Sequence, residues 1–187
     1  MTLDATDRAT LLQVARNAIG HGLVHAYLPE IDVDDHPSSL RAIACTFVTL
    51  HAGAALRGCI GSLRAHRPLV ADVARHAHAA AFADARFEPV QHGELDALRI
   101  HISILSQLEP LQFDGDAELL RILEPGRDGL LIVCGAERAT FLPSVWSSFP
   151  DGTDFLAALK RKAGMPAAAT QYDAWRYTTD DFEEAPE

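Results

Sequence analysis

The residues best suited to chemistry stand in one short stretch that contains two glycines, Leu56-Arg57-Gly58-Cys59-Ile60-Gly61. A cysteine is nucleophilic as its thiolate, and a nearby guanidinium favours that form. Arg57 also carries a planar fork that suits carboxylate or phosphate groups. Gly58 and Gly61 weaken a strand unless backbone or ligand must approach closely. We therefore expect Arg57 and Cys59 to share a thinly covered surface.

Strand alternation decides which of these side chains meet. On an extended chain it directs Leu56 and Ile60 toward the core, and Arg57 and Cys59 to the opposite face. Residues 42–50 are rich in β-branched and aromatic types and are separated from residues 56–61 by a short turn. The two segments are therefore predicted to form an antiparallel hairpin.

His101 is the candidate base for Cys59. It lies in residues 98–104, which alternate strictly and predict a strand with Arg99, His101 and Ser103 on its polar face. If that strand pairs beside residues 56–61 with the polar faces aligned, His101 could activate the thiol. The alternatives are a solvated strand histidine and a cysteine that simply packs, since cysteine is among the most frequently buried residue types.

Helices and further strands must position these residues. Residues 69–82 predict a helix buried along Leu69, Val73 and Ala77, because the apolar period is helical and the segment is rich in alanine. A first helix begins near Thr6 or Asp7. Hairpins and helices mix without regular βαβ alternation, which predicts an α+β fold built on antiparallel sheet with flanking helices. The remaining predicted elements are a first-helix stop at Gly20 or Gly22, helices from 114 or 116 to 123 and from 151 or 153 to 164, and strands at 129–133, 139–142 and 175–178.

Length and composition set the scale of the molecule. The chain has 187 residues, 48% hydrophobic and 22% charged, which is enough for a sizeable core. We expect one domain over residues 6–182, or two intimately packed lobes. Residues 183–187 are an acidic tail, and the chain is expected to fray from Asp180 onward.

Charge and sequence pattern exclude several classes of protein. The formal net charge is −10, which does not favour nucleic acid or anionic lipid as a partner. The first residues are acidic and no long apolar run follows, so a cytoplasmic protein without membrane contact is expected. Three widely spaced cysteines predict neither a disulfide framework nor a zinc site, and the histidine spacings give no ligand set. No metal and no cofactor is expected.

Four motifs resemble one family. Residues 56–61 match its L-R-G-C-I-G signature, and residues 80–90 are similar to its A-F-x-D-x-R-F-x-P. Residues 125–130 and 140–146 agree as well, so the chain is identified as a member of the AMMECR family, protein A of the AmmeMemoRadiSam grouping. The resemblance implies a larger and a smaller lobe, each with antiparallel sheet, and association with Memo-like or radical-SAM proteins. It implies no established reaction, and related sequences more often carry an acid at position 101.

Two functions follow as hypotheses. The first is a binding or adaptor subunit that presents an Arg-Gly-Cys cleft to a small anionic ligand or a partner enzyme. The second is a small enzyme that uses Cys59 as nucleophile or group acceptor, with His101 as its base. The cleft is expected to be bordered by the turns at 84–87 or 127–128. The candidate ligand-binding residues are Arg57, Gly58, Gly61, Arg86, Glu88, Arg127, Asp128 and Thr140.

Overall fold

The predicted hairpin is confirmed in a computed structural model, which describes residues 3–185. Strand β1 (Ile43–Ala52) pairs antiparallel with β2 (Ala55–Gly61). The register holds Thr49 opposite Cys59 and then shifts, so that His51 lies opposite Leu56 and Arg57 is an extra residue in β2. Such a bulge interrupts the alternation of side chains.

The bulge corrects one expectation about residues 56–61. Thr49 and His51 are two positions apart on β1 and share a face, so their partners Cys59 and Leu56 share that face too. Leu56 is accordingly 42% exposed and does not enter the core. Without the bulge, Leu56 would lie on the other face of the sheet from Cys59.

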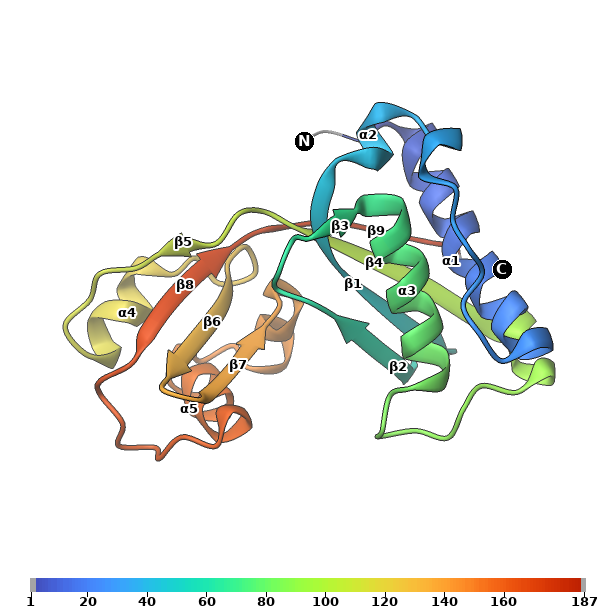
Figure 1. Ribbon diagram of the computed structural model, residues 1–187. Coiled ribbons are helices and arrows are strands. Elements are labelled where there is room, and N and C mark those ends of the chain that lie inside the picture. Colours follow the sequence, from blue (N-terminus) through green and yellow to red (C-terminus); the bar gives the residue numbers. More distant parts are fainter. Residues whose placement is uncertain (1–2, 186–187) are drawn as a thin grey trace. The chain divides into compact units, whose positions relative to one another are not determined.

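The chain divides into two units (Figure 1). Unit 1 comprises residues 3–105 and 180–185, and unit 2 comprises residues 106–179. Each unit contains its own antiparallel sheet and its own helices, which confirms the α+β class.

Within the described residues, unit 1 is built on a five-stranded sheet with the order β2-β1-β4-β9, and the short β3 pairs with β1. Figure 1 shows α3 lying along β1 with α1 beside it, on one face of this sheet. That face supplies core residues such as Val48, Leu50, Ile100 and Ile102, all fully buried. The elements of unit 1 are α1 (Ala5–His25), η1 (Val33–Asp35), α2 (Ser38–Arg41), β1, β2, β3 (Arg67–Pro68), α3 (Leu69–Phe82), η2 (His92–Ala97), β4 (Leu98–Leu105) and β9 (Thr179–Glu183).

The opposite face of the unit 1 sheet carries the polar side chains of the strands. We call this the polar face; it contains Thr49 and His51 of β1, Cys59 of β2, and Arg99, His101 and Ser103 of β4. The strict alternation of residues 98–104 is confirmed, because Leu98, Ile100 and Ile102 are buried in the core on the other side.

The predicted helix at residues 69–82 is confirmed with both ends as expected, and Leu69, Val73 and Ala77 are fully buried. The first helix differs. It is capped by the Asp4 carboxylate and runs through both of its glycines to His25. A Cβ at Gly22 would lie 2.4 Å from the Phe82 ring and 2.8 Å from the His78 ring, so this glycine lets α1 and α3 approach each other.

The expected fraying is wrong for residues 180–184, and its last positions, 186 and 187, lie outside the described residues. Residues 179–183 form β9 at the edge of the unit 1 sheet. Beyond it, the Glu184 carboxylate accepts hydrogen bonds from Arg16 Nε (2.7 Å), Arg16 Nη2 (2.6 Å) and the Ile100 N–H (2.9 Å). Acidic side chains of this segment therefore form specific ion pairs and hydrogen bonds, which the composition alone did not reveal.

Unit 2 has a four-stranded sheet with the order β5-β8-β6-β7 in the described chain. Its core contains Trp146, which stacks on Phe155 with ring centroids 3.7 Å apart. Helix α5 ends at Gly164, whose left-handed backbone (φ 80°) suits a glycine. The elements are β5 (Glu109–Pro110), α4 (Asp116–Ile122), β6 (Gly129–Cys134), β7 (Glu137–Phe141), η3 (Pro143–Ser148), α5 (Gly152–Ala163) and β8 (Asp173–Tyr177).

Candidate functional site

The backbone of Cys59 is held by the turn that follows α3. Its N–H donates to Asp84 Oδ2 (2.9 Å), and its carbonyl accepts from Arg86 Nη2 (3.2 Å). Arg86 in turn donates from Nε to Asp84 Oδ1 (2.9 Å) and from Nη2 to Asp84 Oδ2 (2.7 Å). Two motifs separated by about 25 residues in the sequence therefore form one clamp.

The clamp lies at a sheet edge. β2 is the outer strand, so the outward N–H and carbonyl of Cys59 would otherwise be open to another strand. Asp84, whose side chain is 5% exposed, supplies the acceptor that a neighbouring strand would supply. The pKa of Asp84 is held well below its usual range, first by the hydrogen bonds from Arg86 and against the opposing effect of burial. The carboxylate is thus charged at neutral pH.

Both candidate glycines are explained by close packing. A Cβ on Gly58 would lie 2.2 Å from the carbonyl oxygen of Ala80, in the last turn of α3. A Cβ on Gly61 would lie 2.3 Å from the Phe47 ring. Real Cβ atoms essentially never approach other atoms so closely, so both positions require glycine without any ligand.

Arg57 is engaged by η2. It donates from Nε to Glu94 Oε1 (2.7 Å) and from Nη2 to Glu94 Oε2 (3.1 Å), and its side chain is 15% exposed. The hydrogen bonds to Glu94 raise the pKa of Arg57. Because of the bulge and this forked ion pair, Arg57 links β2 to η2. The cation that contacts Cys59 is instead Arg86.

His101 does not adjoin Cys59. Strand β4 pairs with β1 and not with β2, so Thr49 stands opposite both residues and separates them. His101 Nε2 lies 3.1 Å from Asp181 Oδ1, which also accepts from Ser103 Oγ (2.6 Å). The condition for direct activation of the thiol, adjacent strands with aligned polar faces, is therefore not met.

The thiol of Cys59 has a polar neighbour of another kind. Thr49 Oγ1 donates to Sγ across 3.3 Å, and the residue is half-buried. Arg86 contacts the carbonyl of the same residue, and its side chain is 56% exposed. Cys59 thus has a hydroxyl at its thiol and a partly exposed cation at its carbonyl, which can bind a group, while no base in the described part of the chain is hydrogen-bonded to Sγ.

The other candidate residues are spread over both units. Glu88 is exposed in the segment after α3. In unit 2, Arg127 is an exposed turn residue that pairs with Glu124. Asp128 is buried and accepts at Oδ2 from the Glu124 N–H (3.0 Å). Thr140 Oγ1 lies 2.6 Å from Tyr177 Oη and donates to the Leu130 carbonyl (2.9 Å).

The sequence pattern did not predict two networks of buried charged side chains. In unit 1, Asp72 is fully buried on α3 and accepts at Oδ2 from the N–H (3.1 Å) and hydroxyl (2.8 Å) of Thr46. His76, one helical turn later, lies 3.3 Å from the same oxygen. In unit 2, Lys160 is 1% exposed and donates to Asp116 (2.6 Å). The four-residue spacing of Asp72 and His76 was the available signal.

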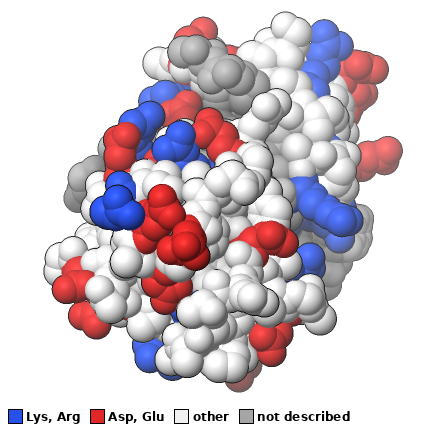
Figure 2. Space-filling view, turned by 90° about the vertical axis from the view of Figure 1, so that its left-hand side faces the viewer, with Lys and Arg blue, Asp and Glu red and all other residues white. Residues whose placement is uncertain are grey.

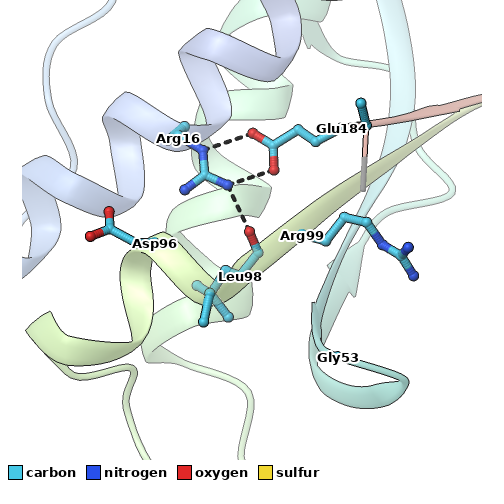
Figure 3. A pocket seen from close by; sticks show the side chains of 8 residues that line it. Arg16, Gly53, Asp96, Leu98, Arg99 and Glu184 are labelled. Atoms are coloured by element: carbon cyan, nitrogen blue, oxygen red, sulfur yellow. Dashed lines mark hydrogen bonds and ion pairs between the residues drawn. The ribbon is translucent and has the colours of Figure 1, made fainter. Parts of the chain in front are cut away.

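A separate hollow lies at the start of β4 in unit 1 (Figure 3). It has a volume of about 550 Å³ and is lined by Arg16, Asp96, Arg99, Glu184 and the turn glycine Gly53, among others. The Arg16–Glu184 pair closes it on one side, where Arg16 Nη2 also donates to the Leu98 carbonyl (2.7 Å). Arg57 and Cys59 do not line this hollow.

Charge is mixed on the face of the molecule drawn in Figure 2. Figure 2 shows a face on which basic and acidic residues are interspersed among uncharged ones, without an extended area of one sign. Among residues 3–185, no three histidine, cysteine, aspartate or glutamate side chains come together in a way that could hold a metal ion. No helix in the same range has the length and apolar character needed to cross a membrane.

The fold and the clamp define a class of protein: an α+β chain of two sheet-containing units, with an L-R-G-C-I-G strand held by a D-x-R turn. The family model described as AMMECR1 matches residues 12–182. The chain therefore belongs to the AMMECR1 family.

Relatives of the chain cover nearly its whole length. A protein of Methanothermobacter thermautotrophicus is 35% identical over 168 residues, which are 88% of this chain and 85% of that protein. A Thermotoga maritima protein is 33% identical over 177 residues, with 91% and 93% covered. Among solved structures, that of the uncharacterized protein PH0010 from Pyrococcus horikoshii is similar, with a TM-score of 0.87, 32% identity, and 94% of this chain and 90% of that chain covered.

Proposed function

We propose that this AMMECR1-family protein is a binding subunit, and that the surface formed by Cys59, Thr49 and Arg86 takes up a small anionic ligand. The observation that carries the proposal is the clamp on Cys59: both of its outward backbone groups are held by Asp84 and Arg86. The clamp fixes the thiol before any ligand arrives, and such preorganisation lowers the entropic cost of binding.

The charge of the ligand follows from Arg86. Its Nε and Nη2 atoms face Asp84, while the side chain remains 56% exposed. A guanidinium edge that is exposed in this way suits a carboxylate or phosphate oxygen. A Memo-like or radical-SAM protein, suggested by the family resemblance, would be the enzyme that uses or supplies this ligand.

Binding is favoured over catalysis because no base within residues 3–185 is hydrogen-bonded to the Cys59 thiol. The group that hydrogen-bonds to Sγ is the Thr49 hydroxyl, which donates and does not remove a proton. His101 lies on the far side of β1 and faces Asp181.

The alternative, a nucleophilic Cys59, rests on the Arg86 guanidinium at the Cys59 carbonyl, a cation that would stabilise negative charge developing during a reaction at this residue. Alkylation by iodoacetamide at pH 7 distinguishes the two functions. Fast reaction confined to Cys59 would support the enzyme, whereas a rate equal to that of the half-buried Cys134 would support the binding subunit.

The experiment compares Cys59→Ser, Arg86→Gln and the control Arg138→Gln, an exposed residue of β7. Inorganic phosphate binding is measured by NMR titration, capture of purified Memo-like and radical-SAM partners by pull-down, and stability by thermal unfolding. We expect Cys59→Ser to weaken binding without a change in the unfolding midpoint. A parallel loss of stability in both variants would instead make the clamp purely structural, and retained binding in both would refute the proposal.

A further inference from the structure

Two histidines adjoin each other at the C-terminal end of α1. The sequence pattern separated them, because it predicted that the first helix stops at Gly20 or Gly22. In the structure α1 continues to His25, so His21 and His25 lie one helical turn apart on the same face. Their ring centroids are 4.4 Å apart. The helix thus brings together two imidazoles, and imidazole is a ligand that suits zinc, copper and nickel ions.

The hydrogen bond of His21 prepares its ring for coordination. Its Nδ1 lies 2.9 Å from the carbonyl oxygen of Tyr27. A carbonyl oxygen only accepts, so Nδ1 carries the hydrogen in this contact, and Nε2 of the neutral ring keeps its lone pair. Metal-binding histidines generally donate their other ring N–H to such an acceptor, which fixes both the tautomer and the orientation of the ring. His21 therefore has the support that a metal ligand requires.

Strained backbone keeps that support in place. Ala26 ends α1 in the left-handed conformation, with φ at 60°, and no other residue besides glycine has a positive φ among residues 3–185. Such outliers occur preferentially at functional sites. The ring of the next residue, Tyr27, lies against both imidazoles, with centroids 4.9 Å from that of His21 and 5.7 Å from that of His25. The three rings form one cluster, which restricts the rotation of the two histidines.

The separation of the two imidazoles bears on the kind of ion. With metal–nitrogen distances of about 2.1 Å, two imidazoles bound at a right angle have centroids about 4.6 Å apart, and two bound at the tetrahedral angle about 5.3 Å. The observed 4.4 Å is closer to the right angle. Nitrogen ligands at right angles are typical of copper(II) and nickel(II), which also bind such ligands tightly among the divalent metals.

The pair is accessible and leaves positions for further ligands. His25 is exposed, and the neighbouring Val24 is 67% exposed. No third histidine, cysteine or acidic side chain joins the pair within the described chain, so water would complete the coordination shell. The carbonyl groups at the end of α1 form the negative end of the helix dipole, which favours a cation there.

From these observations we infer that the C-terminal end of α1 binds a divalent metal ion of the nickel or copper kind. His21 and His25 are its protein ligands. The site shares no residue with the proposed anion-binding surface of Cys59, Thr49 and Arg86. The two proposals therefore fail separately: phosphate binding is expected to be the same in variants of the two histidines as in the wild type.

The test is a titration of the full, tag-free chain with nickel(II) chloride, followed by calorimetry and by NMR. Nickel(II) is the probe because, unlike copper(II), it does not readily oxidise the free cysteines Cys45, Cys59 and Cys134. We expect saturable binding of one ion per chain. Paramagnetic broadening of the NMR signals should be centred on residues 21–27.

Matched variants assign the ligands. His21→Gln and His25→Gln are each expected to weaken nickel binding at least about tenfold, since the loss of even an outer partner of a metal ligand costs about 10–100-fold. His92→Gln, which changes an exposed histidine outside the pair, should leave binding unchanged. Unfolding midpoints establish that each variant is folded. The inference is overturned if nickel does not bind saturably, if either His21→Gln or His25→Gln binds it like His92→Gln, or if the broadening is centred on another part of the chain.

Discussion

The packing of Gly58 against α3 makes a sharp prediction about stability. Replacing Gly58 by alanine would place a Cβ 2.2 Å from the carbonyl oxygen of Ala80, 1.2 Å closer than the 3.4 Å at which ordinary contact begins. The obstructing atom belongs to the backbone of α3, so it cannot rotate away as a flexible side chain could. To accommodate the alanine, β2 and α3 must therefore move apart.

The expected cost follows from opposing effects. Alanine in place of glycine within a strand would by itself stabilise the fold by about 0.5–1 kcal/mol. Overpacking of this kind costs about 1–3 kcal/mol. Movement of the end of α3 also strains the hydrogen bonds of Asp84 and Arg86 to Cys59, and bonds to charged groups contribute about 1.5–3 kcal/mol each. We expect Gly58→Ala to lower the free energy of unfolding by about 2–4 kcal/mol.

The assay is urea unfolding followed by circular dichroism, with thermal unfolding as a second measure. The midpoint temperature should fall by roughly 5–15 °C for a chain of this size. Gly93→Ala is the matched control, because no atom lies within 4 Å of its added Cβ and its backbone needs no positive φ. If Gly58→Ala is as stable as Gly93→Ala, the assignment of Gly58 to packing is wrong and a ligand must be sought there.

Three further predictions concern charge and burial. Because the pKa of Asp84 is depressed in the folded state, its contribution is present above the unfolded value of about 4 and is lost as pH falls below it; Asp84→Asn should flatten this acid limb of the stability curve. Asp116→Ala should destabilise unit 2 by about 2–4 kcal/mol because it leaves the ammonium group of Lys160, which is 1% exposed, without its carboxylate, whereas the exposed Glu137→Ala should change stability by less than about 0.5 kcal/mol in the same unfolding assay. Burial and then the charge of Asp72 raise the pKa of Cys45 to about 11, so mass spectrometry at pH 8 should find it alkylated at least about tenfold more slowly than Cys59. Equal rates at the two cysteines would contradict the burial of Cys45.

The sequence by itself determined the elements whose pattern is local. The helical period and alanine content of residues 69–82 set both ends of α3, and the alternation of residues 98–104 set the inner face of β4. The short turn after residue 50 determined the hairpin of β1 and β2. These features depend on neighbours a few positions away, so composition and spacing were sufficient to predict them.

Only the tertiary structure decided which groups stand beside Cys59. The bulge at Arg57 sends that side chain to Glu94, and the insertion of β1 between β2 and β4 separates His101 from the thiol. The cation at the site comes instead from Arg86, through a turn 25 residues further along the chain.

The burial of Asp72 and Lys160 was decided in the same way, as was the pairing of Glu184 with Arg16. Each of these partnerships joins separate elements, and for a charged side chain the local pattern does not distinguish a solvated residue from a paired, buried one. Burial is favourable for such a group only when its partners are in place, and strand order, bulges and helix packing bring those partners together.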